Sequence, residues 1–207
     1  MKNNLRTRGK ANLVLISLCI LGLLINVILG GGNRFWIFIS GGGYLKDWGD
    51  VSFSTVFVQG QFWRLLTCGY IHLGIFHMLA NVYALWCFGG IMEERLGTIK
   101  YIVVYHMAMM ISAIVWIVIF QQCTMVGASL GIISIYGVYF IWRKTKDTKG
   151  QNILCEGNRN YIIGYAIVGN VIWYTSTIVH FISFIVGGVF CLLFCCKKRS
   201  KEIDEFV

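Results

Sequence analysis

Six long apolar stretches separated by short polar segments run along the chain, at about 12–32, 66–90, 99–120, 127–142, 160–175 and 177–196. An α-helix needs roughly 20 residues to cross the hydrocarbon layer of a bilayer. The first three stretches and the last reach or approach that length, whereas the fourth and fifth are shorter and are expected to start below the membrane surface. The pattern predicts an all-α membrane protein built as a bundle of six transmembrane helices.

The charged residues fall between these stretches or at their edges. Fifteen of the 18 Lys and Arg residues lie in the N-terminal tail, between the second and third stretches, between the fourth and fifth, and in the C-terminal tail. Since basic residues favour the cytoplasmic side, both termini are expected to be cytoplasmic. This orientation predicts a multi-pass protein of the cell membrane.

Composition supports this class, with 57% hydrophobic and only 13% charged residues among 207. One membrane domain is expected over 12–196, between a cytoplasmic tail at 1–11 and a basic tail at 197–207. The first stretch is expected to be an uncleaved helix, because it is long for a signal peptide and five more follow. The net charge of +9 fits an inner rim facing anionic lipid, and it does not indicate nucleic-acid binding.

The longest connection, 33–64, lies on the external side in this orientation. It is rich in aromatic residues and glycines and poor in charge, so we expect part of it to lie in the membrane interface. The eight cysteines form no C-x-x-C pair and no cluster with histidine. Neither a metal site nor a disulfide framework is therefore indicated.

Four polar residues within the apolar stretches suggest chemistry, because a polar group is costly in a bilayer. They are Ser129, His180, His77 and Asn81. The orientation places all four in the outer half of the membrane. Ser129 and His180 are a possible nucleophile and base, and the N–H groups of a helix N-terminus, with His77 and Asn81, are possible oxyanion donors. The apolar stretches hold no carboxylate, so a dyad is favoured over a triad.

A Ser129–His180 contact requires the fourth and sixth helices to pack closely, and small residues permit this. The fourth stretch has Gly127, Ala128, Gly131 and Gly137, and the sixth has Ser183 and Gly187 on the face of His180. We therefore expect these two helices to pair.

Five short patterns follow one another along the chain. They are W-R at Trp63 and Arg64; H-x-x-x-x-H-x-x-x-N at His72, His77 and Asn81; G-G-x-x-E-x-R-x-G at Gly89, Gly90, Glu93, Arg95 and Gly97; G-x-S at Gly127 and Ser129; and a histidine with a glycine seven residues later, at His180 and Gly187. In these patterns, over roughly residues 60–190, the chain resembles the rhomboid intramembrane serine proteases.

The resemblance implies a serine endopeptidase that cuts transmembrane segments of other proteins near the outer membrane face. Ser129 would be the nucleophile and His180 the base, while His77, Asn81 and the Ser129 N–H would form the oxyanion hole. The expected partners are transmembrane substrates and the lipid bilayer, and no cofactor or metal is implied. Trp63 and Arg64 would anchor the external loop, and Glu93 and Arg95 would fix the inner turn between the second and third helices.

Three residues depart from the family pattern. Leu130 follows the serine in place of glycine, Val179 precedes the histidine in place of alanine, and Ser183 replaces a glycine. They leave open a catalytically inactive rhomboid-like protein that binds client helices. Each polar residue also has an ordinary structural interpretation: Ser129 could bond its own helix, and His77 and Asn81 could bridge helices. His72 and His106 are expected to be structural or peripheral. A small transporter is a third possibility, but no ionised side chain and no repeat support it.

Overall fold

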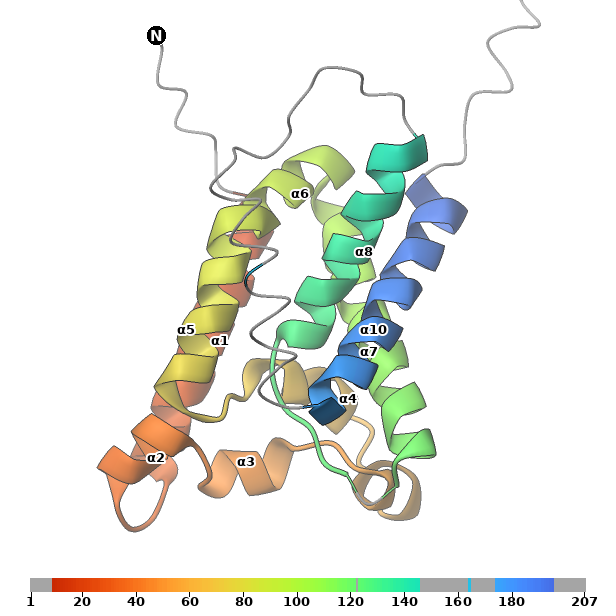
Figure 1. Ribbon diagram of the computed structural model, residues 1–207. Coiled ribbons are helices and arrows are strands. Elements are labelled where there is room, and N and C mark those ends of the chain that lie inside the picture. Colours follow the sequence, from red (N-terminus) through yellow and green to blue (C-terminus); the bar gives the residue numbers. More distant parts are fainter. Residues whose placement is uncertain (1–8, 122, 146–163, 165–173, 196–207) are drawn as a thin grey trace, which may run out of the picture.

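The computed structural model describes residues 9–121, 123–145, 164 and 174–195, and these form a helical bundle (Figure 1). The long helices are α1 (Lys10–Leu29), α5 (Gly74–Ala84), α7 (Thr98–Ile119), α8 (Ser129–Thr145) and α10 (Tyr174–Phe190). A π-helical turn, η3 (Leu85–Gly89), joins α5 to α6 (Gly90–Leu96), and a second, η4 (Cys191–Cys195), extends α10. Four helices in the described residues are long and apolar enough to cross a membrane: Lys10–Leu29, Gly74–Leu96, Thr98–Ile119 and Thr177–Phe194.

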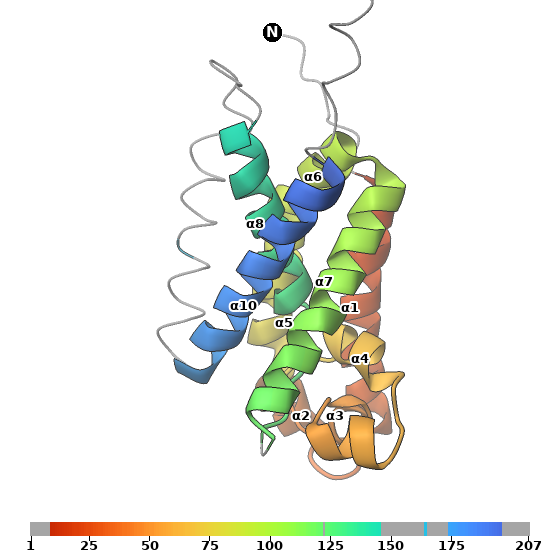
Figure 2. The same cartoon turned by 90° about the vertical axis from the view of Figure 1, so that its right-hand side faces the viewer.

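The direction of the helices agrees with the alternation predicted from the sequence. The beginning of α1, the α6–α7 turn and the last turns of α8 and α10 lie together at one end of the bundle (Figure 1). The opposite end carries the first turns of α5 and α10 and the end of α7, whereas the first turn of α8 lies inside the bundle, above α4 (Arg64–Thr67) (Figures 1 and 2). All segments predicted to be cytoplasmic that the structure describes therefore lie at the first end.

The helix α8 occupies the centre of the bundle. Every residue of 130–138 is buried, and α8 packs against both α7 and α10 (Figure 2). A helix that is apolar on all sides lies either inside protein or in the lipid bilayer. The low polarity of this segment thus reflects burial in protein as much as contact with lipid.

Residues 34–70, which include most of the connection predicted to be external, fold into a compact layer across the end of the bundle opposite the α6–α7 turn (Figure 1). We call this layer the external segment. It contains α2 (Arg34–Ser40), α3 (Tyr44–Gly49), the π-turn η1 (Ser54–Val58), α4 (Arg64–Thr67) and the 3₁₀ turn η2 (Cys68–Tyr70). Many of its aromatic side chains are exposed, as expected for a segment at a membrane interface: Phe35, Trp36, Tyr44, Trp48, Phe57, Phe62 and Trp63.

The predicted boundaries of the second stretch are wrong at both ends. The helix starts at Gly74 rather than 66, because Gly74 has φ +76 and approaches the Ile39 carbonyl of α2 so closely that a Cβ would overlap it. It continues past residue 90 to Leu96, and Gly97 with φ +79 ends it. Hydropathy alone misses both limits, because apolar residues precede the start and polar ones occupy the last turn.

The last helix starts earlier than the predicted sixth stretch, at Tyr174 rather than 177. The fifth apolar stretch, 160–175, lies almost entirely outside the described residues, as do the tails 1–8 and 196–207.

Candidate active site

Ser129 is the first residue of α8, inside the bundle on the side nearer the external segment (Figure 1). The Ala128 carbonyl accepts the Ile132 N–H at 3.1 Å, which is the bond expected of the residue that begins a helix. Gly127, two residues before the serine, has φ +120, a conformation that favours glycine. The turn thus directs the leading N–H groups of α8 out of the helix, with the half-buried Ser129 side chain beside them.

His180 contacts this serine from α10. Its Nε2 atom lies 2.9 Å from Ser129 Oγ, a hydrogen-bonding distance. The two side chains belong to helices that run side by side in the same direction (Figures 1 and 2). The sequence separation of 51 residues means that only tertiary packing brings them together.

Two glycines allow α8 and α10 to approach this closely. A Cβ on Gly137 would overlap the Phe184 carbonyl of α10, and a Cβ on Gly187 would overlap the Ser134 carbonyl of α8. The predicted pairing of these helices is confirmed. Gly131 does not take part as expected: a Cβ there would lie 2.5 Å from the Tyr105 ring, so it faces α7 instead.

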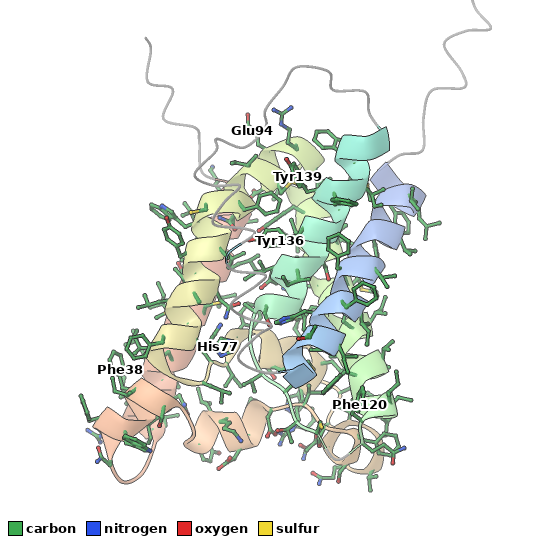
Figure 3. All side chains as sticks on the ribbon, in the orientation of Figure 1. Phe38, His77, Glu94, Phe120, Tyr136 and Tyr139 are labelled. Carbon is green, nitrogen blue, oxygen red and sulfur yellow. The ribbon has the colours of Figure 1, made fainter. Side chains whose placement is uncertain are left out.

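His77 lies on the inner side of α5, facing the turn before α8 (Figure 3). A Cβ on Gly127 would lie 2.7 Å from His77 Cε1 and 3.0 Å from Nε2, so glycine leaves the space that this ring occupies. His77 Nδ1 accepts the Leu73 N–H at 3.3 Å. A neutral ring that accepts at Nδ1 carries its proton on Nε2, so Nε2 is an N–H donor beside the turn.

Asn81 follows His77 on the same face of α5 and is fully buried. Its side-chain amide donates to the His77 carbonyl at 2.9 Å. This bond ties the amide to the helix turn that carries His77.

The three departures from the family pattern fit into the packing. Leu130 and Val179 are buried in the apolar core, at 2% and 5% exposure. Ser183 is also buried, and its hydroxyl donates to the Val179 carbonyl at 2.9 Å. None of them disrupts the 2.9 Å contact between His180 and Ser129.

Arg64 anchors the external segment, as the sequence predicts. It is only 6% exposed, and its Nη1 donates to the carbonyls of Asp47 and Asp50 at 3.1 and 2.8 Å and to Asp50 Oδ1 at 3.3 Å. Burial raises the pKa of the Asp50 carboxyl, and the nearby Lys46 and Arg64 cations oppose that shift. Trp63 is half exposed, with its ring centroid 6.3 Å from that of Trp48.

This anchored segment also holds the turn that carries Ser129. Val51 and Met125 exchange two backbone hydrogen bonds of 3.1 Å, and the Gly127 N–H donates to the Cys68 carbonyl at 2.8 Å. The external segment is therefore part of the structure that positions the serine.

The G-G-x-x-E-x-R-x-G residues lie at the opposite end of the bundle. Glu93, 3% exposed, accepts the Ala11 N–H at 3.2 Å, the Asn12 N–H at 2.8 Å and the Thr98 hydroxyl at 2.8 Å. It therefore caps α1 as well as fixing the turn at Gly97. A carboxylate at a helix N-terminus is favoured by the helix dipole.

The remaining residues of this motif have different roles. Gly89 packs against the Asn12 side chain, for a Cβ there would overlap Asn12 Oδ1, while Gly90 is half-buried. Arg95 is exposed, and its guanidinium lies 5.9 Å from the centroid of the Trp142 ring on α8. The expectation that Glu93 and Arg95 are structural agrees with these contacts.

The two other histidines lie near the site without touching the serine in any contact observed. His72 is 1% exposed, with its ring against that of His77, at a centroid distance of 5.1 Å. His106 on α7 hydrogen-bonds with the Tyr70 hydroxyl and with the Ile102 carbonyl. Within the described residues, no three His, Cys, Asp or Glu side chains gather in a way that could hold a metal ion.

The sequence interpretation missed Tyr105, whose hydroxyl donates to the Ala128 carbonyl at 3.4 Å. A tyrosine within an apolar helix is easily counted as apolar, although its hydroxyl needs a partner when buried. The sequence does show two tyrosines four residues apart in this apolar stretch, Tyr101 and Tyr105. The structure finds both fully buried.

Comparison with known proteins agrees with this geometry. A family model, the Rhomboid domain, matches residues 59–197, which is more than half of the chain. Rhomboid protease GluP of Bacillus subtilis is 31% identical over 119 residues, covering 55% of this chain and 23% of that protein. RHOMBOID-like protein 7 of Arabidopsis thaliana is 27% identical over 114 residues, covering 53% of this chain and 36% of that protein.

A third relative bears on activity. Inactive RHOMBOID-like protein 8 of Arabidopsis thaliana is 30% identical over 64 residues, covering 31% of this chain and 18% of that protein. The chain thus spans about a third or less of the length of these three relatives. With apolar helices long enough to span a bilayer and a domain match over most of the bundle, this chain is a multi-pass membrane protein that belongs to the rhomboid family.

Proposed function

We propose that this protein is an intramembrane serine endopeptidase that uses Ser129 as nucleophile and His180 as general base. The observation that carries the proposal is the 2.9 Å contact between Ser129 Oγ and His180 Nε2, made between two helices in a largely apolar bundle. A hydroxyl and an imidazole at this distance are the minimal nucleophile–base pair. Membership of a family that includes a relative named as a protease adds support.

The chemistry follows from these groups. Ser129 Oγ attacks the carbonyl carbon of the scissile peptide bond while its proton moves to His180 Nε2. The resulting oxyanion is stabilised by the Ser129 N–H, by His77 Nε2–H and by the Asn81 amide. His180 then gives its proton to the leaving amine as the C–N bond breaks, which leaves an acyl-enzyme. A water molecule, deprotonated by His180, hydrolyses the ester and restores the serine hydroxyl.

The substrates on this proposal are transmembrane segments of other proteins, cut near the outer face of the cell membrane. Ser129 begins α8 and His180 lies in the second turn of α10, both in the half of the bundle nearer the external segment. In the proposed topology the membrane domain, 12–196, has six spans and both termini are cytoplasmic. The clustering of Lys and Arg in the segments predicted to be cytoplasmic supports this orientation.

The experiment that tests the proposal compares the wild-type protein with Ser129→Ala for cleavage of a membrane-inserted reporter carrying a transmembrane segment. Loss of the hydroxyl should abolish cleavage, because no other nucleophile is proposed for the site. Expression and thermal stability should stay unchanged, since Ser129 is half-buried and alanine fits a helix start. Cleavage at the wild-type rate by Ser129→Ala would refute the proposal.

A second candidate is a rhomboid-like protein that binds client helices without cutting them. Two observations favour it: the departures at Leu130, Val179 and Ser183, and a relative named as inactive. Client binding without any reaction of Ser129 toward a fluorophosphonate or isocoumarin would support this candidate, and covalent labelling of Ser129 would exclude it.

A further inference from the structure

The helix α7 contacts the two segments that hold Ser129 in place, which are the first turn of α8 and the turn Cys68–Tyr70. Tyr105 is fully buried, with its ring against Gly131, where a Cβ would lie 2.5 Å from Tyr105 Cε2 and 2.6 Å from Cζ. Its hydroxyl donates to the Ala128 carbonyl at 3.4 Å. Tyr105 therefore packs against the first turn of α8 and also bonds the residue just before the serine.

The bond to Ala128 bears on the orientation of the Ser129 N–H. The Ala128 carbonyl and the Ser129 N–H belong to one planar trans peptide, so they point in opposite directions. Two donors hold this carbonyl, the Tyr105 hydroxyl and the Ile132 N–H at 3.1 Å. Together they keep the Ser129 N–H directed away from the body of α8, where the proposed oxyanion would form.

The next residue on α7, His106, holds the second of these segments, Cys68–Tyr70. Its Nδ1 bonds the Ile102 carbonyl at 2.8 Å and must donate there, since a carbonyl only accepts. The Nε2 atom of the neutral ring then accepts from the Tyr70 hydroxyl. Tyr70 lies two residues after Cys68, whose carbonyl accepts the Gly127 N–H at 2.8 Å.

Gly69 closes the contact between this segment and α7. A Cβ on Gly69 would overlap the Met109 sulfur, so its backbone lies directly on the helix. Met109 lies one turn after both Tyr105 and His106 on α7, at spacings of four and three residues. Gly127, through the Cys68 carbonyl, and Ala128, through its own carbonyl, are thus both attached to neighbouring positions of one helix.

We propose that Tyr105 and His106 are positioning residues for the oxyanion hole and the nucleophile, a role that rests on the proposed protease function. Tyr105 acts through the Ala128 carbonyl, and His106 acts through Tyr70 and the Cys68 carbonyl. In the low dielectric of the buried interior, a hydrogen bond is electrostatically stronger than in water. They keep the Ser129 peptide in the orientation that oxyanion binding requires.

The test compares three tyrosine-to-phenylalanine variants of the full chain in detergent or liposomes. Tyr105→Phe and Tyr70→Phe remove the two hydroxyls that hold the turn while keeping the rings. Tyr101→Phe is the matched control, because Tyr101 is also fully buried on α7 but its hydroxyl donates to Asn12 Oδ1 at 2.8 Å, at the other end of the bundle. For each variant, kcat and KM on a transmembrane reporter and the midpoint of thermal unfolding are measured.

Tyr105→Phe and Tyr70→Phe should each lower kcat by roughly tenfold with KM nearly unchanged, part of the 10²- to 10³-fold loss that follows removal of a whole oxyanion donor. Tyr101→Phe should lower the unfolding midpoint at least as much as Tyr105→Phe and leave kcat unchanged. This separation of kcat from stability is not expected if the hydroxyls only stabilise the fold.

Wild-type kcat in both Tyr105→Phe and Tyr70→Phe, with an active wild-type protein, would overturn this inference and leave the proposed function intact. An equal loss of kcat in Tyr101→Phe would also overturn it. An inert wild-type protein would instead refute the protease function, and the inference with it. If Tyr105→Phe failed to fold, Tyr70→Phe would decide the question by the same measurements.

Discussion

The bundle contains two polar clusters in otherwise apolar surroundings, one at each end, and they differ in how their polar groups are used. At the α6–α7 end, Glu93 accepts three hydrogen bonds, and the Asn12 side chain donates to the Leu85 carbonyl at 3.0 Å and accepts from Tyr101 at 2.8 Å. All three side chains are at most 3% exposed. This cluster connects α1, η3 and α7.

At the other end, Asn81 is fully buried, but three polar side chains are only partly buried. Ser129, His77 and His180 are all half-buried. Ser129 and His180 bond each other, and His77 uses Nδ1 within its own helix turn so that its Nε2–H faces the site. Polar groups that bond structural partners on all sides stabilise a bundle, whereas groups that keep donors at a half-buried surface can act on a substrate.

The largest loss of activity is expected for His77→Ala, in the cluster that contains Ser129. Loss of the Nε2–H donor should lower kcat on a transmembrane reporter by about 100-fold, with KM and thermal stability little changed. His77→Gln, which keeps an N–H donor in reach, should lose less. An unchanged kcat in His77→Ala would show that this ring is structural, like the residues of the other cluster.

An intermediate effect is expected for Glu93→Gln at the opposite end. The neutral amide loses the charge at the N-terminus of α1 and turns an N–H toward groups that are donors, so stability should fall by about 1–3 kcal/mol. Thermal unfolding in detergent measures this loss, while kcat below the unfolding transition should be unchanged.

The control for that variant is Glu94→Gln at the adjacent position. Glu94 is exposed and points away from the bundle (Figure 3), so its substitution should leave both stability and kcat unchanged. A large loss of kcat in Glu93→Gln without a loss of stability would break the distinction between the two clusters.

The smallest effect should come from Asp50→Asn in the external segment. The pKa of Asp50 is raised because burial disfavours the charged form. The folded state thus prefers the neutral carboxyl, and wild-type stability falls as the pH rises through this raised pKa. Asparagine cannot ionise, so the variant should be more stable than wild type by less than about 1 kcal/mol at neutral pH.

This advantage should shrink as the pH falls to about 4, where the wild-type carboxyl is increasingly protonated. Thermal unfolding of both proteins across that range measures the difference. A deficit of Asp50→Asn at neutral pH that disappears in acid would mean that the ion pair with Arg64, and not desolvation, dominates at this site.

The sequence was sufficient for the central contact. Ser129 and His180 lie near the starts of segments with the same direction, and the small residues that follow each of them predicted that the fourth and sixth helices pair. Gly137 and Gly187 carry that prediction, because each leaves room for the facing backbone. The segments 12–32 and 99–120 were also close to the helices observed, Lys10–Leu29 and Thr98–Ile119.

Other features depend on partners distant in the chain. The apolar run before Gly74 resembles the start of a helix, but it forms short turns whose Cys68 carbonyl bonds Gly127. Glu93 caps a helix that begins about 80 residues earlier, and nothing local indicates that partner. Gly131 was assigned to the wrong neighbour because a small residue shows that a close approach is possible, but not which helix makes it.

The most direct test of the account is identification of the residue that a fluorophosphonate probe modifies in the purified protein, by mass spectrometry of the peptide containing residue 129. Activation of Ser129 by His180 predicts a covalent adduct on Ser129 in the wild-type protein and almost none in His180→Ala, whose fold should persist. Equal labelling of both proteins, or no adduct on Ser129 in folded wild-type protein, would contradict the central claim that the imidazole activates this hydroxyl.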